Sequence, residues 1–325
     1  MIIARAPFRV SICGGGSDLP SFYEKHGGCV ISTTIKKYCY LTLHPAFMKN
    51  DISLKYSKTE NVHDYSEINH EIFKECFRRF KINGVEIASM ADVPAGTGLG
   101  SSSTFTVALL KLLYTYQNKY VSTYHIAKEA CEIEIESLHN PIGKQDQFAA
   151  AFGGLKFYEF MRDGFVKIEP IIMKPESYKK LQGNLLMFYT GITRSASKIL
   201  DEQKKNIEHD KAKEEILVKM CDLTRELKAH LEQNDVDYVG EVLAKAWSLK
   251  KQMAGSISQS VIDEYYERGI KAGATGGKLL GAGGGGFLLF YVPQDKQESV
   301  RKELKELKEL PFEFDNSGVS IVFND

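Results

Sequence analysis

The sequence has no long apolar run and no net charge, and each absence excludes a class of protein. Although 43% of its 325 residues are hydrophobic, no apolar stretch approaches the ~20 residues that a membrane-spanning helix needs. Lysine plus arginine and aspartate plus glutamate balance at 42 each, so no global field attracts nucleic acid or an anionic membrane surface. We therefore expect neither nucleic acid nor membrane as a partner.

Paired cysteines are also absent. The six cysteines are scattered, without a Cys-x-x-Cys pair and without histidine at the spacing of a metal site. This pattern argues against a disulfide framework and predicts reduced, buried thiols. The first residues, Met-Ile-Ile-Ala-Arg-Ala-Pro-Phe-Arg-Val, lack the apolar core of a signal peptide. We accordingly expect a cytoplasmic protein.

Two common nucleotide-binding motifs are missing as well. A Walker A loop needs Gly-Lys followed by Ser or Thr, whereas the Gly-Lys pairs at residues 143–144 and 277–278 are followed by other residues. Residues 281–286 have the glycine spacing of a dinucleotide-binding loop, but a strand pattern follows at residues 287–292 where a helix is required. The sequence therefore excludes both motifs.

One stretch of the sequence is rich in glycine, the residue with the fewest restrictions on its backbone angles. Residues 92–103 read Asp-Val-Pro-Ala-Gly-Thr-Gly-Leu-Gly-Ser-Ser-Ser, and their three glycines let main-chain N–H groups converge on one point. Residues 101–116 follow with apolar positions at helical spacing, and their serines are suited to capping the helix start. A helix N-terminus there predicts a phosphate site, with hydroxyls available to a phosphate-bound Mg²⁺. The alternative is a flexible loop, against which Pro94 argues.

The length favours two moderate domains over one large core. We place the boundary between residues 1–175 and 176–325, because a hairpin pattern turned at Asp163-Gly164 there gives way to a more helical α+β half. Strands are predicted at residues 1–12, 27–40, 38–45, 52–56, 85–91, 155–160, 165–172, 185–189, 286–292 and 319–323. Helices are predicted at residues 65–80, 101–116, 122–138, 195–233, 235–253, 259–272 and 298–310.

Glu134 is the most informative carboxylate of the helix pattern at residues 122–138. At about 100° per residue it falls among apolar residues, whereas Glu132, Glu136 and Glu129 fall on the solvated side. A buried carboxylate needs a cation nearby. Either a metal ion or a buried ion pair with lysine or arginine would satisfy it.

The roles of three further charged residues stay open on the sequence alone. Asp146 follows a glycine turn and precedes an alanine-rich segment, so it could lie beside a reacting hydroxyl, although capping a helix at residues 147–152 is the default. Arg9 stands on a strand pattern and alone indicates nothing more. Asp18 is the one carboxylate of a second glycine-rich loop, residues 13–20, which read Cys-Gly-Gly-Gly-Ser-Asp-Leu-Pro.

Three separated segments, in this order, resemble the GHMP kinases, the family of galactokinase, homoserine kinase, mevalonate kinase and phosphomevalonate kinase. Residues 5–18 (Arg-Ala-Pro-Phe-Arg-Val-Ser-Ile-Cys-Gly-Gly-Gly-Ser-Asp) resemble the first family motif. Residues 94–103 resemble the second, Pro-x-x-x-Gly-Leu-Gly-Ser-Ser, and residues 278–287 (Lys-Leu-Leu-Gly-Ala-Gly-Gly-Gly-Gly-Phe) the third. The resemblance spans nearly the whole chain. It implies an α+β fold, with an N-terminal ribosomal-protein-like α/β domain that has a left-handed crossover, and a C-terminal ferredoxin-like domain.

The resemblance also implies roles for individual residues. Ser102 and Glu134 would hold Mg²⁺, Asp146 would be the catalytic carboxylate, and Arg9 would sit by the attacking oxygen. The third motif would support the site from the second domain and, through Gly283 and Gly284, meet the substrate. The ATP phosphates would bind the loop formed by Pro94, Gly96, Gly98, Leu99, Gly100, Ser101, Ser102 and Ser103.

Within the family, the match is best to sugar kinases, and above all to the subgroup that phosphorylates the anomeric hydroxyl of a heptose 7-phosphate. Galactokinases carry Gly-Glu-His-Thr-Asp where this chain has residues 14–18. Gly15 and Gly16 therefore replace two sugar-binding side chains, leaving Asp18 for a sugar hydroxyl and more room for a larger substrate. Phe8, where the family often has glycine, is a departure from the pattern.

The implied partners are a sugar phosphate and ATP, while monomer and homodimer both stay open. Another sugar 1-kinase, acting on fucose, galactose or a uronic acid, is the first alternative. A catalytically silent regulator that binds sugar and nucleotide is the second. Retention of Asp146, Glu134 and Arg9 together argues against the silent regulator.

A sugar phosphate brings about two negative charges, so we expect cationic donors beyond those that serve ATP. Residues 190–197, Thr-Gly-Ile-Thr-Arg-Ser-Ala-Ser, follow a strand pattern and open a helix, with hydroxyls flanking Arg194. Arg194 is thus a candidate for binding the sugar's phosphate. Equally, a hydroxyl could cap the helix while Arg194 points to solvent.

Overall fold

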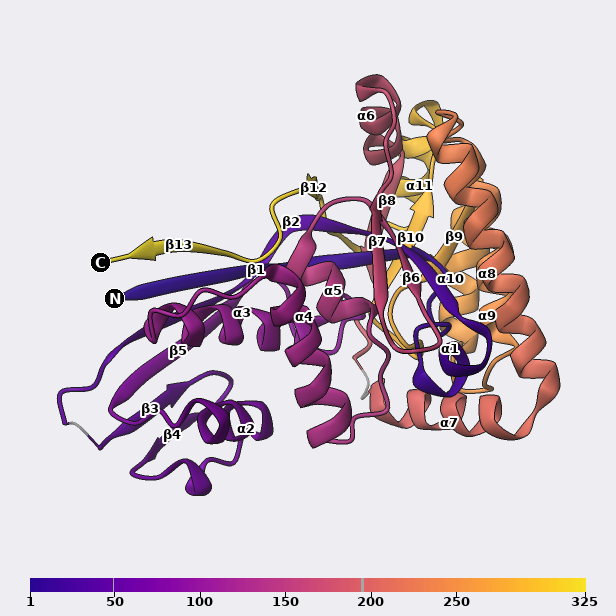
Figure 1. The fold of residues 1–325 in the computed structure, drawn as a ribbon. Coiled ribbons are helices and arrows are strands. Elements are labelled where there is room, and N and C mark those ends of the chain that lie inside the picture. Colours follow the sequence, from indigo (N-terminus) through magenta and orange to yellow (C-terminus); the bar gives the residue numbers. More distant parts are fainter. Residues whose placement is uncertain (49, 194–195) are drawn as a thin grey trace.

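Two sheets carry the architecture of the chain (Figure 1), which the computed structural model describes at residues 1–48, 50–193 and 196–325. In those residues the first sheet has nine strands, with the main path β13-β1-β2-β5-β3-β4. They are β1 (Ile2–Cys13), β2 (Gly28–Pro45), β3 (Ile52–Lys55), β4 (Thr59–Val62), β5 (Val85–Ala91), β6 (Lys156–Phe160), β7 (Val166–Pro170), β12 (Phe314–Asp315) and β13 (Ser320–Asn324).

The long antiparallel pair of β1 and β2 is the spine of the first sheet. β2 is one continuous strand of 18 residues and not the two strands expected from its halves, because its β-branched and aromatic residues include no turn signal. β6 pairs with its first half and β5 with its second. The register of β1 shifts between Pro7 and Arg9 and again between Ser11 and Cys13. Such bulges re-aim side chains, and both flank residues of the site described below.

Helices cover the first sheet with their apolar faces. They are α1 (Pro20–His26), α2 (Glu71–Phe80), α3 (Ser101–Tyr116), α4 (Thr123–Cys131) and α5 (Gln145–Phe152). α3 has the predicted bounds and packs on β1 and β2. The helix expected at residues 122–138 begins at Thr123, with Ser122 as its N-cap, and continues beyond α4 as a π-helical segment, Glu132–Ser137. The short helix α1 and the short strand β4 were not predicted, because each has too few residues to show a period.

The second sheet is antiparallel, with the strand order β11-β8-β10-β9. Its strands are β8 (Leu185–Tyr189), β9 (Gly276–Leu279), β10 (Phe287–Tyr291) and β11 (Lys308–Glu309). The helices of this half are α6 (Pro175–Gly183), α7 (Ala196–His209), α8 (Lys211–Glu232), α9 (Tyr238–Lys251), α10 (Ser260–Lys271) and α11 (Gln297–Glu303). The succession of strand, helices, two strands, helix and strand gives the ferredoxin-like arrangement.

Some sequence patterns of this half are confirmed, but α6, β9 and β11 were not predicted, and the helix expected at residues 195–233 is divided into α7 and α8. The predicted apolar stripe of α8 is buried and consists of Ile216, Met220, Leu223, Leu227 and Leu231. The helix expected at residues 298–310 is wrong in its second half, because α11 ends at Glu303 and β11 then pairs with β8. The Lys and Glu pairs that suggested a long helix add only a few tenths of a kcal/mol each, and burial of Leu304 and Leu307 overrides them.

The end of the chain returns to the first sheet. β13 pairs with β1, β12 pairs with β2, and the amino group of Met1 donates to the Asp325 carbonyl oxygen at 3.3 Å. Figure 1 shows both ends side by side. Phe8 is 1% exposed and belongs to an apolar cluster that joins β1 to α8 and α9. The proposed boundary at residue 175 therefore separates a half built on the first sheet from a half built mainly on the second. One apolar cluster contains residues of both halves.

Two expectations about composition can be compared with the structure. All six cysteines are free and buried, as predicted. Within the described ranges, no helix combines the length and the apolar character that crossing a bilayer requires.

Candidate active site

The loop before α3 has the shape that its glycines predict. Gly96, Gly98 and Gly100 have φ angles of 75°, 86° and 79°, which side-chain-bearing residues rarely adopt. Gly100 itself is the N-cap of α3 and no side chain caps the helix. The prediction that a serine caps α3 is therefore wrong, because the left-handed Gly100 takes that position. The serines lie in the first turn, and the helix N-terminus stays open to an anion.

The third motif supports this loop by backbone contact, as the resemblance implied. A Cβ atom on Gly98 would lie 2.5 Å from the Leu280 carbonyl oxygen, and one on Gly286 would lie 2.3 Å from the Thr97 carbonyl oxygen. Only glycine permits so close an approach. The two motifs, nearly two hundred residues apart in the sequence, thus form one unit.

A cavity of about 850 Å³ lies against both motifs. This volume is within the range of ligand sites, ~300–1,000 Å³. The predicted residues that line it are Arg9, Gly15, Gly16, Asp18, Gly96, Gly98, Gly100, Ser101, Ser102, Ser103, Asp146 and Gly283. The chain therefore brings the first and second motifs, Asp146 and part of the third motif to one place.

Some predicted residues lie elsewhere. Pro94 and Leu99 shape the loop without lining the cavity: the Pro94 carbonyl accepts from the Thr97 hydroxyl at 2.9 Å, and Leu99 is fully buried. Gly284 also lies outside the lining, and its N–H donates to the Ile257 carbonyl at 2.8 Å. Arg194 lies outside the described residues.

Arg9 and Asp146 form a bidentate ion pair at the cavity wall. Arg9 Nε donates to Asp146 Oδ1 at 2.8 Å and Arg9 Nη2 donates to Oδ2 at 2.7 Å. Arg9 Nη1 donates to the Gly98 carbonyl at 2.6 Å, which ties the pair to the glycine loop before α3. Asp146 lies in the first turn of α5 and caps nothing, since Lys144 is the N-cap. The default of a capping Asp146 is therefore wrong, because a charge-assisted pair with a residue 137 positions away holds the carboxylate.

Glu134 is fully buried, as its helical phase predicted. It accepts from the Ser102 hydroxyl at 2.7 Å and from Gln147 Nε2 at 2.9 Å. Burial raises the pKa of Glu134 to about 7, against the lowering effect of these hydrogen bonds. In the described part of the chain no lysine, arginine or histidine forms an ion pair with this carboxylate. The buried ion pair that the sequence left open is thus not what satisfies Glu134.

The donor set at Glu134 fits a small divalent cation. Among the residues that the structure describes, no group of three His, Cys, Asp or Glu side chains could enclose a metal ion. A metal here would instead take the Ser102 hydroxyl, the Glu134 carboxylate and oxygens of a bound phosphate. Mg²⁺ binds in this way, with one or two protein carboxylates and substrate phosphates.

Asp18 is a third carboxylate of the site and also lines the cavity. It is 3% exposed, and it accepts from the Gly16 N–H at 2.9 Å and from the Gln145 N–H at 3.1 Å. Burial raises the pKa of Asp18, and the charge of Asp146 raises it further. A Cβ atom on Gly143 would lie 1.9 Å from Asp18 Oδ2. Gly143 is therefore required for this carboxylate to face the cavity.

Several residues of the site were not predicted from the sequence. Gln147 directly follows Asp146, but Asp146 is the only residue of that segment to which a role was assigned. Lys278 opens the third motif, whose glycines alone were assigned a role. Other lining residues that were not predicted include Ser11, Tyr56, His70, Phe105, Gln145 and Lys250. They carry no local signal, since each resembles an ordinary strand or helix residue.

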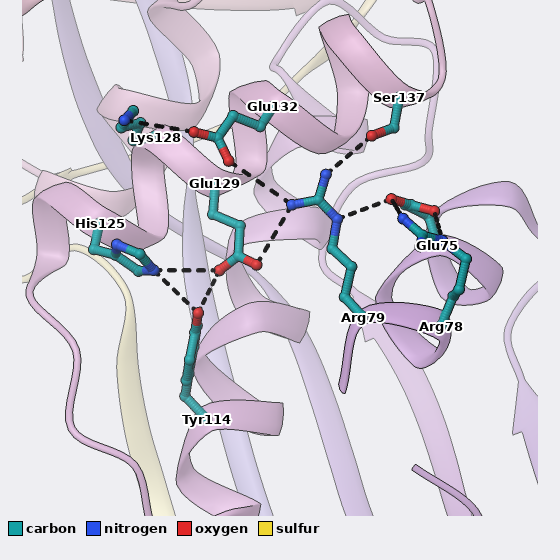
Figure 2. A network of polar contacts seen from close by, with 9 residues as sticks. All are labelled: Glu75, Arg78, Arg79, Tyr114, His125, Lys128, Glu129, Glu132 and Ser137. Atoms are coloured by element: carbon teal, nitrogen blue, oxygen red, sulfur yellow. Dashed lines mark hydrogen bonds and ion pairs between the residues drawn. The ribbon is translucent and has the colours of Figure 1, made fainter. Parts of the chain in front are cut away.

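Arg79 of α2 fixes the π-helical segment that carries Glu134 (Figure 2). Its guanidinium donates to Ser137 Oγ at 2.9 Å at the end of the segment, and lies 3.8 Å from the Glu132 carboxylate at its start. It also binds Glu75 at 2.8 Å and lies 3.6 Å from Glu129. Glu129 is thus largely buried and not solvated as expected. π-Helical turns are frequent at functional sites, and here one arginine holds both ends of such a turn.

We expect Arg79→Met to lower the free energy of unfolding by about 1–3 kcal/mol, because it leaves the largely buried Glu129 without an arginine partner and removes one of the two arginines that pair with Glu75. Urea unfolding followed by circular dichroism measures this. Arg78→Met is the matched control: it also pairs with Glu75, but its side chain is 56% exposed, so its loss is expected to stay below about 1 kcal/mol. Equal losses in both variants would contradict the role of Arg79.

Comparison with known proteins gives matches to the same kinase family in both halves of the chain. Residues 68–154 match the family described as GHMP kinases N terminal domain, and residues 227–309 match GHMP kinases C terminal. The D-glycero-alpha-D-manno-heptose 7-phosphate kinase of Campylobacter jejuni is 30% identical over 94% of this chain and 93% of its own. The bifunctional fucokinase/GDP-fucose pyrophosphorylase of Arabidopsis thaliana is 26% identical over 97% of this chain but 32% of its own.

Among solved structures, a D-glycero-D-manno-heptose 1-phosphate kinase from Bacteroides thetaiotaomicron superimposes with a TM-score of 0.82 at 25% identity, covering 100% of both chains. The fold match extends over the same three motifs that form the cavity. The similarity thus covers the whole architecture and not one half of it.

Proposed function

The chain belongs to the GHMP kinases and is a sugar kinase, and from this premise we propose that it transfers phosphate from ATP to the anomeric hydroxyl of D-glycero-D-manno-heptose 7-phosphate. The observation that carries the proposal is the similarity to the Campylobacter enzyme over nearly the whole of both chains. Gly15 and Gly16 support it, because they leave space beside Asp18 for a sugar larger than a hexose.

Asp146 would accept the proton of the attacking hydroxyl, and Arg9 would hold the carboxylate in place. The bidentate pair fixes both oxygens of Asp146 and keeps a positive charge beside the position of transfer. Asp18 would accept a hydrogen bond from another sugar hydroxyl and so orient the ring. The role of these residues is positioning and electrostatic stabilisation, which dominate phosphoryl transfer.

The ATP phosphates would bind the open N-terminus of α3 and the N–H groups of the glycine loop. When bound between Ser102 and Glu134, Mg²⁺ would neutralise charge on those phosphates. The cavity lining also includes Tyr56, His70 and Phe105 of α3. These rings offer flat surfaces for the nucleoside, while the polar end at Asp18 remains for the sugar.

The proposal is tested by incubating the purified protein with ATP and a panel of acceptors. The panel contains heptose 7-phosphate, heptose 1-phosphate, unphosphorylated heptose, galactose, fucose and a uronic acid. We expect the highest kcat/KM with heptose 7-phosphate, and phosphorus NMR of the product should show a new phosphate coupled to the anomeric proton. Faster turnover of galactose or fucose would overturn the substrate assignment, and a preference for heptose 1-phosphate would overturn the position of transfer.

A further inference from the structure

Two lysines of the second half, Lys250 and Lys278, line the cavity on the side that faces the first motif. We propose that they form a binding subsite for the phosphate that the sugar substrate already carries. This inference rests on the proposed function, since it assumes an acidic sugar as acceptor. It assigns a role to Lys250 and to Lys278, the first residue of the third motif, neither of which received one from the family resemblance.

Lys278 is held in place by the first strand. It lies on β9, is 5% exposed, and donates through Nζ to the Ser11 carbonyl at 3.1 Å and the Ile12 carbonyl at 3.2 Å. The Ser11 hydroxyl beside it is buried and has no hydrogen-bond partner. Ser11 is 4% exposed and lines the cavity. A cation and the unpaired hydroxyl of the residue whose carbonyl it binds therefore both line the cavity.

Lys250 is the last but one residue of α9 and is half-buried. Its Nζ donates to the Gly281 carbonyl of the third motif, and in the described residues no carboxylate forms an ion pair with it or with Lys278. The lysine next to it, Lys251, points elsewhere and lies 3.3 Å from Asp263. Backbone carbonyls satisfy part of each ammonium group, but they do not neutralise it.

The charges of neighbouring residues, Lys278 among them, act on the ammonium group of Lys250. Burial lowers the pKa of Lys250 to about 7, with the charges of Lys278 and Arg9 lowering it further and those of Asp18 and Asp146 opposing this. Burial likewise lowers the pKa of Lys278 to about 8. Buried like charges destabilise each other unless an anion lies between them. A phosphate dianion has the charge and the acceptor oxygens that this wall lacks.

A phosphate at this wall could come from the sugar or from the γ-position of ATP. The contacts of Lys278 favour the sugar, because Ser11 and Ile12 lead directly into the glycine loop that holds Asp18. The ATP phosphates would have their own site at the start of α3, as proposed above. Substitution of a lysine can separate the two sources, because it should weaken only the ligand whose phosphate binds at this wall.

The decisive comparison is Lys250→Met against Lys251→Met, which removes an equal charge from the next residue of the helix. Calorimetry measures binding of heptose 7-phosphate, of unphosphorylated heptose and of a non-hydrolysable ATP analogue. We expect Lys250→Met to weaken heptose 7-phosphate by roughly 10- to 100-fold, with the other two ligands within about twofold of native affinity. Lys250→Arg, which keeps the charge, should recover part of the loss, and Lys251→Met should bind all three ligands normally.

Equal losses for heptose and its phosphate would overturn the subsite, and a loss confined to the ATP analogue would assign the lysines to the nucleotide. Inorganic phosphate provides a probe that does not depend on the sugar. With the ATP analogue and Mg²⁺ saturating, it should bind the native protein and bind Lys250→Met about tenfold more weakly. If the heptose assignment fails but this difference persists, the proposed function is wrong and the anion subsite stands; if phosphate binds both proteins equally, the subsite is refuted.

Discussion

Asp146→Asn should lower kcat by ~10²–10⁴-fold, the usual contribution of a group that accepts a proton in the transition state. The amide has the shape of the carboxylate but cannot take the proton of the sugar hydroxyl. It also loses the charge that draws Arg9 Nε and Nη2 to it at 2.8 and 2.7 Å. Asp146 lies beside Gly100, the N-cap of α3, but its carboxylate oxygens are bonded to Arg9. Because the amide fills the same space, binding of ATP should stay near its native strength.

Steady-state kinetics at saturating ATP, with calorimetry for nucleotide affinity, separate these two effects. Asp163→Asn is a matched control on an exposed hairpin turn and should leave kcat unchanged. A near-native kcat in Asp146→Asn would remove Asp146 as the base. In a loose transition state the hydroxyl loses its proton late, which would place the loss at the lower end of the range.

Glu134→Gln should raise the Mg²⁺ concentration required for half-maximal activity by about tenfold or more, because it removes the charged ligand from a buried site and leaves Ser102 alone. The substitution keeps the size of the side chain and its bond to Gln147. Calorimetric titration of Mn²⁺ into the complex with an ATP analogue gives a second measurement, independent of turnover.

Glu132→Gln and Glu136→Gln are the controls for this effect. Glu132 lies 3.6 Å from Lys128 on the outer side of the same segment, and its side chain is 34% exposed. Glu136 is exposed. Neither should change the metal requirement by more than about twofold, since exposed charges interact weakly. Similar shifts in all three variants would mean that Glu134 is not a metal ligand.

Local periodicity predicted the parts of the site that depend on one element. The inward position of Glu134 follows from helical phase alone, and the shape of the loop before α3 follows from its glycines. Arg9 and Asp146 could be brought together only through the family resemblance. Their pairing depends on a contact across 137 residues, which no local pattern encodes.

Other features escaped prediction for physical reasons. Lys250 ends an amphipathic helix, where a lysine usually complements the helix dipole in solvent, and only the packing of α9 against the third motif turns it inward. The cap of α3 was misassigned because a left-handed glycine replaced a side-chain cap. β2 was predicted as two strands, because the pattern of a strand does not show its length when no turn residue interrupts it.

The return of β12 and β13 to the first sheet bears on how the protein is made. During synthesis the segment that carries Arg9 leaves the ribosome early, but the partner that covers the outer edge of β1 emerges about three hundred residues later. Until then that edge can pair with another nascent chain. Contacts of such long sequence separation also form slowly. The outer edge of β1, on the strand that also carries Arg9, is therefore among the last parts of the first sheet to be paired.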